Sequence, residues 1–147
     1  HLSQQCTLHH LYLLAPALVL QLNIPLALKF ARLLQKLGFK YVRNRAGNLF
    51  SQLYNELAYR RLPIATVVEI LTLIQNFHFV VPSCPTDLFL GVYDKVVNVG
   101  AVEKRFAGVA TTTTHWLTNS AHVLPLDGDI NIIASCMQQH FETTNAT

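Results

Sequence analysis

The chain has 147 residues, of which 51% are apolar and only 13% are charged, against about 25% charged residues in a typical soluble domain. That length allows one core or three to four stacked repeats, and the low charge indicates that partners cover much of the surface. The formal net charge of +3 conceals a division: residues 1–61 hold eight basic residues and one acidic residue, and residues 62–147 hold three basic and seven acidic residues. The three cysteines, Cys6, Cys84 and Cys136, are odd in number and far apart, which argues against a disulfide framework and favours a reducing compartment.

The first predicted helix covers residues 7–22, where leucines recur at helical spacing. Its run 11–20 is the most apolar part of the chain, but Pro16 interrupts it and a membrane helix needs about 20 apolar residues. No basic segment of a signal peptide precedes it. We therefore expect a buried helix and no membrane insertion. Because the chain begins with His1 instead of Met, we interpret it as a processed chain or a fragment.

The next two helices have clear boundary signals. A helix is predicted over residues 24–38, with Asn23 as its N-cap and Pro25 in its first turn. It is apolar on most sides, which is typical of a helix packed between neighbours. Its partner is predicted over residues 46–61 and is stopped by Pro63.

The remaining helices are predicted from the same spacing. They cover residues 64–78, 86–99, 102–116 and 130–141. The run Thr111–Thr114 has poor helix propensity and would favour a strand in isolation. A helix is nevertheless predicted there because the apolar spacing agrees with a repeat found elsewhere in the chain.

That repeat relates Ile24–Phe39 to Ile64–Phe79 at a constant offset of 40 residues. A fixed period of about 20–50 residues is typical of solenoids and arrays. The sequence therefore predicts an all-α fold, an α-solenoid of helical hairpins with a period of about 40 residues and about seven helices. The expected organisation is one helical-repeat domain over 1–142, made of a partial repeat 1–22, repeats 23–62, 63–100 and 101–142, and a polar tail 143–147.

Motifs for catalysis are not apparent in the sequence. The chain contains no Gly-x-Ser-x-Gly, no Gly-rich phosphate loop and no Cys-x-x-Cys. The acidic residues are scattered, and the closest pair, Asp127 and Asp129, fits a turn followed by a helix cap. We therefore expect no enzyme activity, no catalytic residues and no small-molecule substrate.

Potential metal ligands occur in two small groups. Cys6 lies near His9 and His10, and Cys136 lies one helical turn before His140. Each group has too few ligands for a closed zinc site, and the two groups would lie at opposite ends of a helical array. The sequence thus predicts no metal and no cofactor.

Basic residues form the most informative feature, because no acidic residue occurs before Glu56. Cationic side chains along a track, with aromatic rings between them, are typical of phosphate and base binding. The equivalent positions of the later copies are also polar, Glu69, Thr72 and Asn76 and then Thr112, His115 and Asn119, which predicts one continuous exposed stripe along the first helix of each repeat. The predicted nucleic-acid-binding residues are Lys29, Arg32, Lys36, Lys40, Tyr41, Arg43, Arg45, Thr72, Asn76 and His115. An acidic protein partner, or an ordinary solvated face without a partner, remains an alternative.

The segment Leu33–Phe39, Leu-Leu-Gln-x-Leu-Gly-Phe, and its counterpart Leu73–Phe79 resemble the organellar RNA-binding helical repeats of the octotricopeptide type and of FAST-kinase-like and RAP-domain proteins. This resemblance implies an α-solenoid in a mitochondrion or chloroplast; we expect the mitochondrial matrix, with another intracellular location as the alternative. It implies a non-catalytic RNA-binding component of an organellar ribonucleoprotein, either a mitochondrial ribosome or an RNA-processing complex, whose partners are RNA and neighbouring protein subunits. The alternative is a protein scaffold subunit that binds an acidic partner without touching RNA.

Overall fold

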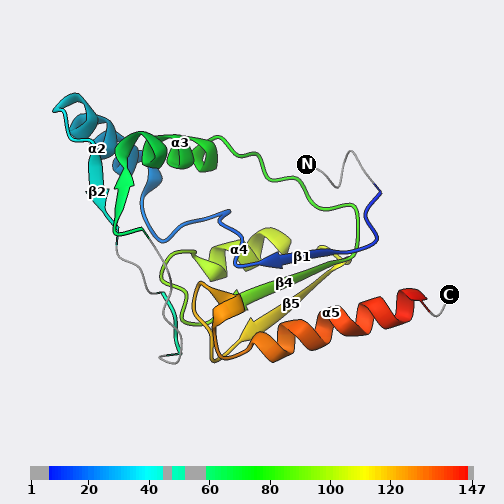
Figure 1. Ribbon diagram of the computed structural model, residues 1–147. Coiled ribbons are helices and arrows are strands. Elements are labelled where there is room, and N and C mark those ends of the chain that lie inside the picture. The colour runs from blue at the N-terminus through cyan, green and yellow to red at the C-terminus, as the bar shows by residue number, and fades with distance from the viewer. Residues whose placement is uncertain (1–6, 45–47, 52–58, 146–147) are drawn as a thin grey trace.

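The computed structural model describes residues 7–44, 48–51 and 59–145, and its central feature is a parallel β-sheet (Figure 1). The strands β1 (Leu11–Leu14), β4 (Thr86–Gly91) and β5 (Thr112–Leu117) lie in the order β1-β4-β5. Both neighbours of β4 run parallel to it. The predicted all-α solenoid is therefore wrong, because strands and helices alternate along the described chain.

The strand β4 forms because it is buried on both faces. All six of its residues are buried, and Leu88, Phe89 and Leu90 have no exposed surface. A continuous apolar run is typical of the central strand of a parallel sheet, but periodicity alone cannot distinguish it from a buried helix. The helix predicted over 86–99 was wrong for this reason.

In β5 the local preference of the chain prevails over the apparent repeat. The segment contains three consecutive threonines, Thr112–Thr114, whose β-branched side chains fit a pleated sheet better than a helix. The helix predicted over 102–116 is wrong over this part. Between β4 and β5, the helix is α4 (Val99–Phe106), which begins at the last residue of the helix predicted over 86–99. Asn98 caps it, because its Oδ1 accepts the Ala101 amide at 3.0 Å.

The two faces of the sheet are covered by different helices (Figure 1). On one face, Leu88 and Leu90 pack with Val102 and Phe106 of α4. On the other face, Phe89 packs in a cluster with residues from α5 (Ile130–Asn145) and from the short 3₁₀ helix η1 (Leu124–Leu126). Alternate residues of β4 therefore point to α4 and to α5, which places Asp87 on the α5 side with Phe89.

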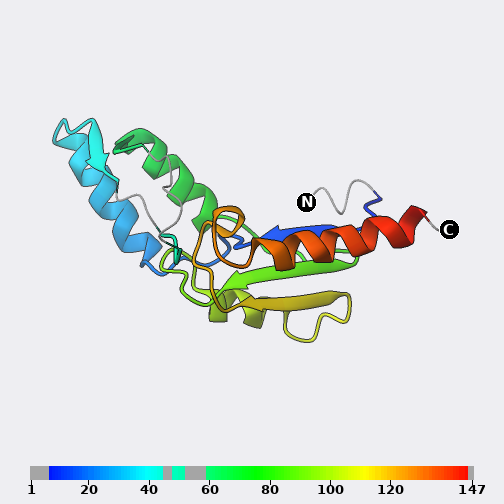
Figure 2. The same cartoon turned by 60° about the horizontal axis from the view of Figure 1, so that its bottom comes forward.

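The segment between β1 and β4 forms a helical layer. It contains α2 (Ile24–Lys36) and α3 (Ile64–Gln75), joined through the antiparallel pair β2 (Tyr41–Arg43) and β3 (Arg61–Pro63). This layer lies beyond the carboxyl ends of the sheet strands (Figures 1 and 2). The predicted α2 and α3 are confirmed within two or three residues. The Asn23 cap is also confirmed, since its Oδ1 accepts the Leu26 amide at 3.0 Å.

The two repeat-related helices do not pack as an array. They contact each other, and they bury Leu28 and Ala31 of α2 and Ile64 and Leu71 of α3. The repeat predicts that Leu33, Leu37, Leu73 and Phe77 lie in the core, but these side chains are exposed to different degrees: Leu33 52%, Leu37 65%, Leu73 70% and Phe77 39%. The sequence similarity reflects two amphipathic helices of similar length, without a stacked repeat.

The other predicted helices have mixed outcomes. The helix over 130–141 is confirmed as α5, which continues to Asn145. The helix over 7–22 is wrong, because β1 and turns occupy that segment. Most of the helix over 46–61 lies outside the described residues. Within the described segments, no helix combines the length and the apolar character that crossing a membrane requires.

Candidate active site

The first residue of the candidate site is Asp94, which follows the carboxyl end of β4. A turn closed by the Asp94 amide on the Gly91 carbonyl, at 3.2 Å, brings its side chain back toward the sheet. Its Oδ1 accepts the amides of Val96 and Val97 at 2.7 and 2.8 Å. The Asp94 side chain is completely buried, so these backbone bonds fix its orientation.

The second residue is His122, which follows the carboxyl end of β5. Its Nδ1 lies 2.9 Å from Oδ2 of Asp94, and its side chain is 29% exposed. Burial opposes ionisation of Asp94, but the bonds from His122, Val97 and Val96 outweigh it and hold the pKa of this carboxyl below its usual value. Because an ionised carboxylate only accepts, Nδ1 donates the proton of this hydrogen bond, and Nε2 is the nitrogen left to exchange a proton with a substrate or nucleophile.

Two aspartates fix the loop that carries His122. Asp127 accepts the Ala121 amide at 2.8 Å, and Asp129 accepts the Asn119 amide at 2.7 Å and the Ser120 hydroxyl at 2.9 Å. Burial of Asp127 is outweighed by its backbone hydrogen bonds, which lower the pKa of its carboxyl. The predicted turn at these two aspartates is confirmed, and its additional role is to position the histidine loop.

The segment 48–51 joins the helical layer to this site. The carbonyl of Asn48 accepts the His122 amide at 3.0 Å, and its Oδ1 accepts the Lys95 amide at 3.0 Å. The Phe50 ring stacks on Tyr93, with 4.5 Å between ring centroids. The backbone of Lys95 and His122 and the side chain of Tyr93 are therefore tied to the insertion between β1 and β4.

This arrangement can carry out acid–base chemistry. A carboxylate that binds Nδ1–H fixes the tautomer and stabilises the imidazolium that forms when Nε2 takes a proton. The pair also lies at the carboxyl ends of parallel strands, where ligands bind in open α/β sheets. The candidate reaction is thus one in which His122 removes a proton from a nucleophile.

The residues predicted to bind nucleic acid lie elsewhere. Lys29, Arg32 and Lys36 are exposed on α2, Lys40 precedes β2, and Thr72 and Asn76 lie in and directly after α3. Tyr41 and Arg43 of β2 line an open hollow of about 470 Å³ together with Arg60 and Arg61. Arg45 lies outside the described residues.

The predicted continuous stripe is wrong. His115 belongs to β5 and its Nε2 bonds Asp87 at 2.6 Å, so it is not a solvent-facing position of a third helix.

Sequence reasoning missed both Asp94 and His122. One signal could have found them: a carboxylate shortly after one buried apolar segment and a histidine shortly after the next, as expected when two parallel strands end at one edge. The helix assigned to both segments concealed this signal.

Comparisons with known proteins support a different fold from the one expected. No protein-family model matches the chain, and no curated protein matches it in sequence. A solved structure described as "LipS and LipT, two metagenome-derived lipolytic enzymes" superposes with a TM-score of 0.67 at 21% identity, over 92% of this chain. The chain shares the α/β-hydrolase fold. It spans about half, 55%, of the length of that solved chain.

This likeness overturns the expectations that depended on the helical repeat. The resemblance to octotricopeptide, FAST-kinase-like and RAP-domain repeats is wrong, because this chain contains a parallel sheet as well as helices and superposes on the structure of a lipolytic enzyme. The expected non-catalytic RNA-binding or scaffold component, with RNA and protein subunits as its partners and no small-molecule substrate, is corrected with it. The organellar location stays a prediction.

Proposed function

We propose that this chain supplies the acid–base pair of an ester hydrolase, with His122 as the general base and Asp94 as the residue that orients it. The observation that carries the proposal is the 2.9 Å bond from Nδ1 of His122 to Oδ2 of Asp94 beyond the carboxyl ends of β4 and β5. The fold likeness to a lipolytic enzyme supports the same reaction class. Fold alone does not determine function, so the geometry of the pair carries the argument.

The proposed reaction has two steps. His122 Nε2 accepts the hydroxyl proton of a serine nucleophile while the oxygen attacks the ester carbonyl, and the resulting imidazolium gives the proton to the departing alcohol. Water then repeats the sequence on the acyl enzyme and releases the acid. Asp94 remains ionised throughout and holds Nδ1–H, as its lowered pKa favours.

The nucleophile would belong to a segment outside the printed sequence. In α/β hydrolases the triad members follow in the chain order nucleophile, acid, histidine, and Asp94 precedes His122 in that order. The 147 residues contain no Gly-x-Ser-x-Gly. We therefore assign two of the three residues to this chain and leave the third to the remainder of the protein.

An apolar ester fits the helical layer. Leu26, Phe30 and Leu33 of α2 are 65%, 61% and 52% exposed. The helical layer lies beyond the carboxyl ends of the sheet strands (Figure 2), and the Asp94–His122 pair follows the carboxyl ends of β4 and β5. Apolar side chains of this size favour contact with an acyl chain because each buried methylene contributes about 0.8 kcal/mol. The substrate class that we propose is therefore a carboxylic ester with an apolar acyl group.

Hydrolysis of p-nitrophenyl butyrate by the whole protein that contains this chain tests the proposal. His122→Ala should lower kcat by about 10³-fold or more, because the general base is removed. His78→Ala is the matched control, since His78 is exposed and takes no part in the hydrogen bonds described at Asp94 and His122, and it should leave kcat unchanged. Equal activity of His122→Ala and the wild type, or no ester hydrolysis by the whole protein, would overturn the proposal.

A further inference from the structure

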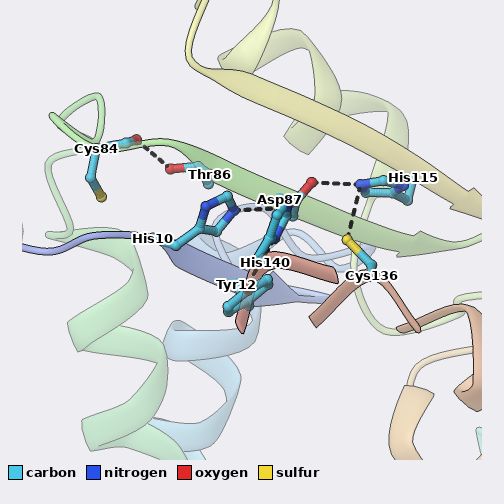
Figure 3. A network of polar contacts seen from close by, with 8 residues as sticks. All are labelled: His10, Tyr12, Cys84, Thr86, Asp87, His115, Cys136 and His140. Carbon is cyan, nitrogen blue, oxygen red and sulfur yellow. Dashed lines mark hydrogen bonds and ion pairs between the residues drawn. The ribbon is translucent and has the colours of Figure 1, made fainter. Parts of the chain in front are cut away.

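A second polar cluster gathers around Asp87, at the opposite end of β4 from Asp94 (Figure 3). Asp87 is the second residue of β4 and is only 4% exposed, on the face of the sheet covered by α5. His115 of β5 and Cys136 of α5 point toward it. Their ligand atoms, one from each residue, all lie within 4.8 Å of one another. The proposed hydrolase reaction uses none of these three side chains.

The way these atoms meet is unlike a catalytic relay. In a relay, the histidine bonds the carboxylate through one ring nitrogen and the nucleophile through the other. Here Nε2 of His115 lies 2.6 Å from Oδ1 of Asp87 and 4.0 Å from Sγ of Cys136. One nitrogen faces both partners, so three potential ligand atoms converge on one point in space.

The spacing of these atoms is close to that of a tetrahedral zinc site. Zinc bonds of about 2.0–2.3 Å place neighbouring ligand atoms about 3.3–3.6 Å apart. The observed 2.6 and 4.0 Å separations lie on either side of this range, and shifts below about 1 Å would bring both into it. A thiolate, an imidazole and a carboxylate are the three ligand types that zinc takes from proteins.

Neighbouring side chains already hold two of the three ligands, Asp87 and His115, in place. His10 Nε2 bonds the other carboxylate oxygen, Oδ2, at 2.5 Å, and His140 Nδ1 lies 3.5 Å from that same oxygen. The ring of His115 stacks on Phe89, with centroids 4.6 Å apart and planes at 14°. Such outer contacts orient metal ligands and strengthen the site.

A hollow open to solvent lies beside two of the three ligands. His115 and Cys136 line a hollow of about 440 Å³ together with Asn131, Ser135 and Gln139 of α5. A zinc ion held by three protein ligands keeps a fourth position for water or another small ligand. The hollow provides both an entry route and space for that fourth ligand.

We propose that Asp87, His115 and Cys136 form a zinc-binding site with water as the fourth ligand. The site is independent of the Asp94–His122 pair, because the two lie at opposite ends of β4. The sequence predicted no metal because its two groups of potential ligands, Cys6 with His9 and His10, and Cys136 with His140, were each too small; Asp87 and His115 belonged to neither group. Only the parallel register of β4 and β5 and the crossing of α5 bring the three ligands together.

Metal titration of chelator-treated protein tests this site. With Zn²⁺ alone, calorimetry should show one ion bound per chain, and the midpoint of thermal unfolding should rise with zinc concentration because only the folded state presents all three ligands. Co²⁺ in place of Zn²⁺ should give a thiolate-to-metal charge-transfer band in the near ultraviolet. Cys136→Ser should abolish that band and weaken zinc binding by about 100-fold or more, as Asp87→Asn should.

Two control variants test whether zinc binds at this site or elsewhere in the protein. Cys84→Ser removes a buried cysteine outside the cluster and should keep the charge-transfer band. His122→Ala should also leave zinc affinity unchanged, which distinguishes this site from the proposed hydrolase pair. If Asp87→Asn does not fold, the cobalt spectrum of Cys136→Ser still decides the question. Absence of zinc binding by the wild type, or wild-type affinity in Cys136→Ser, would overturn the proposal.

Discussion

Gly91 and Ala121 are in such close contact that a Cβ on Gly91 would lie 2.1 Å from the Ala121 carbonyl oxygen. Gly91 ends β4 and Ala121 precedes His122, so this contact sets the distance between the two strand ends that carry the candidate pair. The Ser120 carbonyl oxygen, 2.7 Å from the same Cβ position, prevents relief by a small movement. Glycine is therefore required at position 91 because no side chain fits between the two strand ends, and not because of its backbone angles.

The first prediction is that Gly91→Ala separates the two loops. We expect it to lower the free energy of unfolding by about 3 kcal/mol, at the upper end of the range for an overpacked core, because backbone atoms must move. Urea denaturation measures this change. Gly100→Ala is the matched control: Gly100 lies in α4 with no clashing atom, and alanine there should stabilise by up to about 1 kcal/mol. Similar effects of the two substitutions would contradict the role assigned to Gly91.

The second prediction compares two leucines of opposite burial. Leu88→Ala should destabilise the protein by about 3–5 kcal/mol, because Leu88 is fully buried between β4 and α4. Leu73→Ala should change the free energy of unfolding by less than about 1 kcal/mol, since 70% of Leu73 is exposed. Chemical denaturation of both variants checks the difference. A larger loss of unfolding free energy for Leu73→Ala than for Leu88→Ala would contradict the exposure of Leu73 on α3.

The third prediction concerns acid stability at Asp127. Its carboxylate accepts amides from Phe50, Ser51 and Ala121, and the pKa is lowered. A lowered folded-state pKa contributes stability above the unfolded value, near 4, and this contribution is lost as the pH falls through the folded value.

Asp127→Asn should therefore reduce the free energy of unfolding by about 1–3 kcal/mol at neutral pH. The difference from the wild type should shrink below about pH 4, where the wild-type carboxyl also becomes protonated. Unfolding measured from pH 7 downward tests this convergence. A difference that is constant with pH would show that the Asp127 charge contributes nothing.

The sequence predicted helices better than strands, for a physical reason. Residues 24–36 and 64–75 are amphipathic helices that end near recognisable signals, and their existence follows from pattern alone. In β4, Leu88–Leu90 is a short apolar run without alternation, which fits a helix turn as well as a central strand. In β5 the threonine run carried the correct signal, but the apparent repeat was given more weight.

The candidate site could not be predicted until the strands were placed. Asp94 and His122 are 28 residues apart, and nothing in their local sequence links them. What joins them is the parallel pairing of β4 with β5, which brings both strand ends to one edge. The basic residues on α2 were correctly predicted to be exposed, but exposure and charge do not identify a partner.

The last prediction separates the two roles of the Asp94 carboxylate. Oδ1 receives two backbone amides, from Val96 and Val97, and Oδ2 receives the His122 ring. Asparagine can keep the first role, because its carbonyl oxygen accepts the same amides, but its amide nitrogen cannot accept Nδ1–H. Asp94→Asn should therefore lower kcat for ester hydrolysis by about 10³–10⁴-fold through the wrong tautomer of His122. Its free energy of unfolding should change by only about 1 kcal/mol.

Asp94→Ala removes both roles and leaves the amides of Val96 and Val97 without an acceptor. We expect it to be as inactive as Asp94→Asn and less stable than that variant by about 2–6 kcal/mol, from about 1–3 kcal/mol for each unsatisfied amide. Denaturation and ester hydrolysis measured on the same preparations give both quantities. Full activity in Asp94→Asn would remove Asp94 from the reaction. Equal stability of the two variants would show that the turn at Val96 and Val97 does not depend on this side chain, and that the carboxylate is retained for His122 alone.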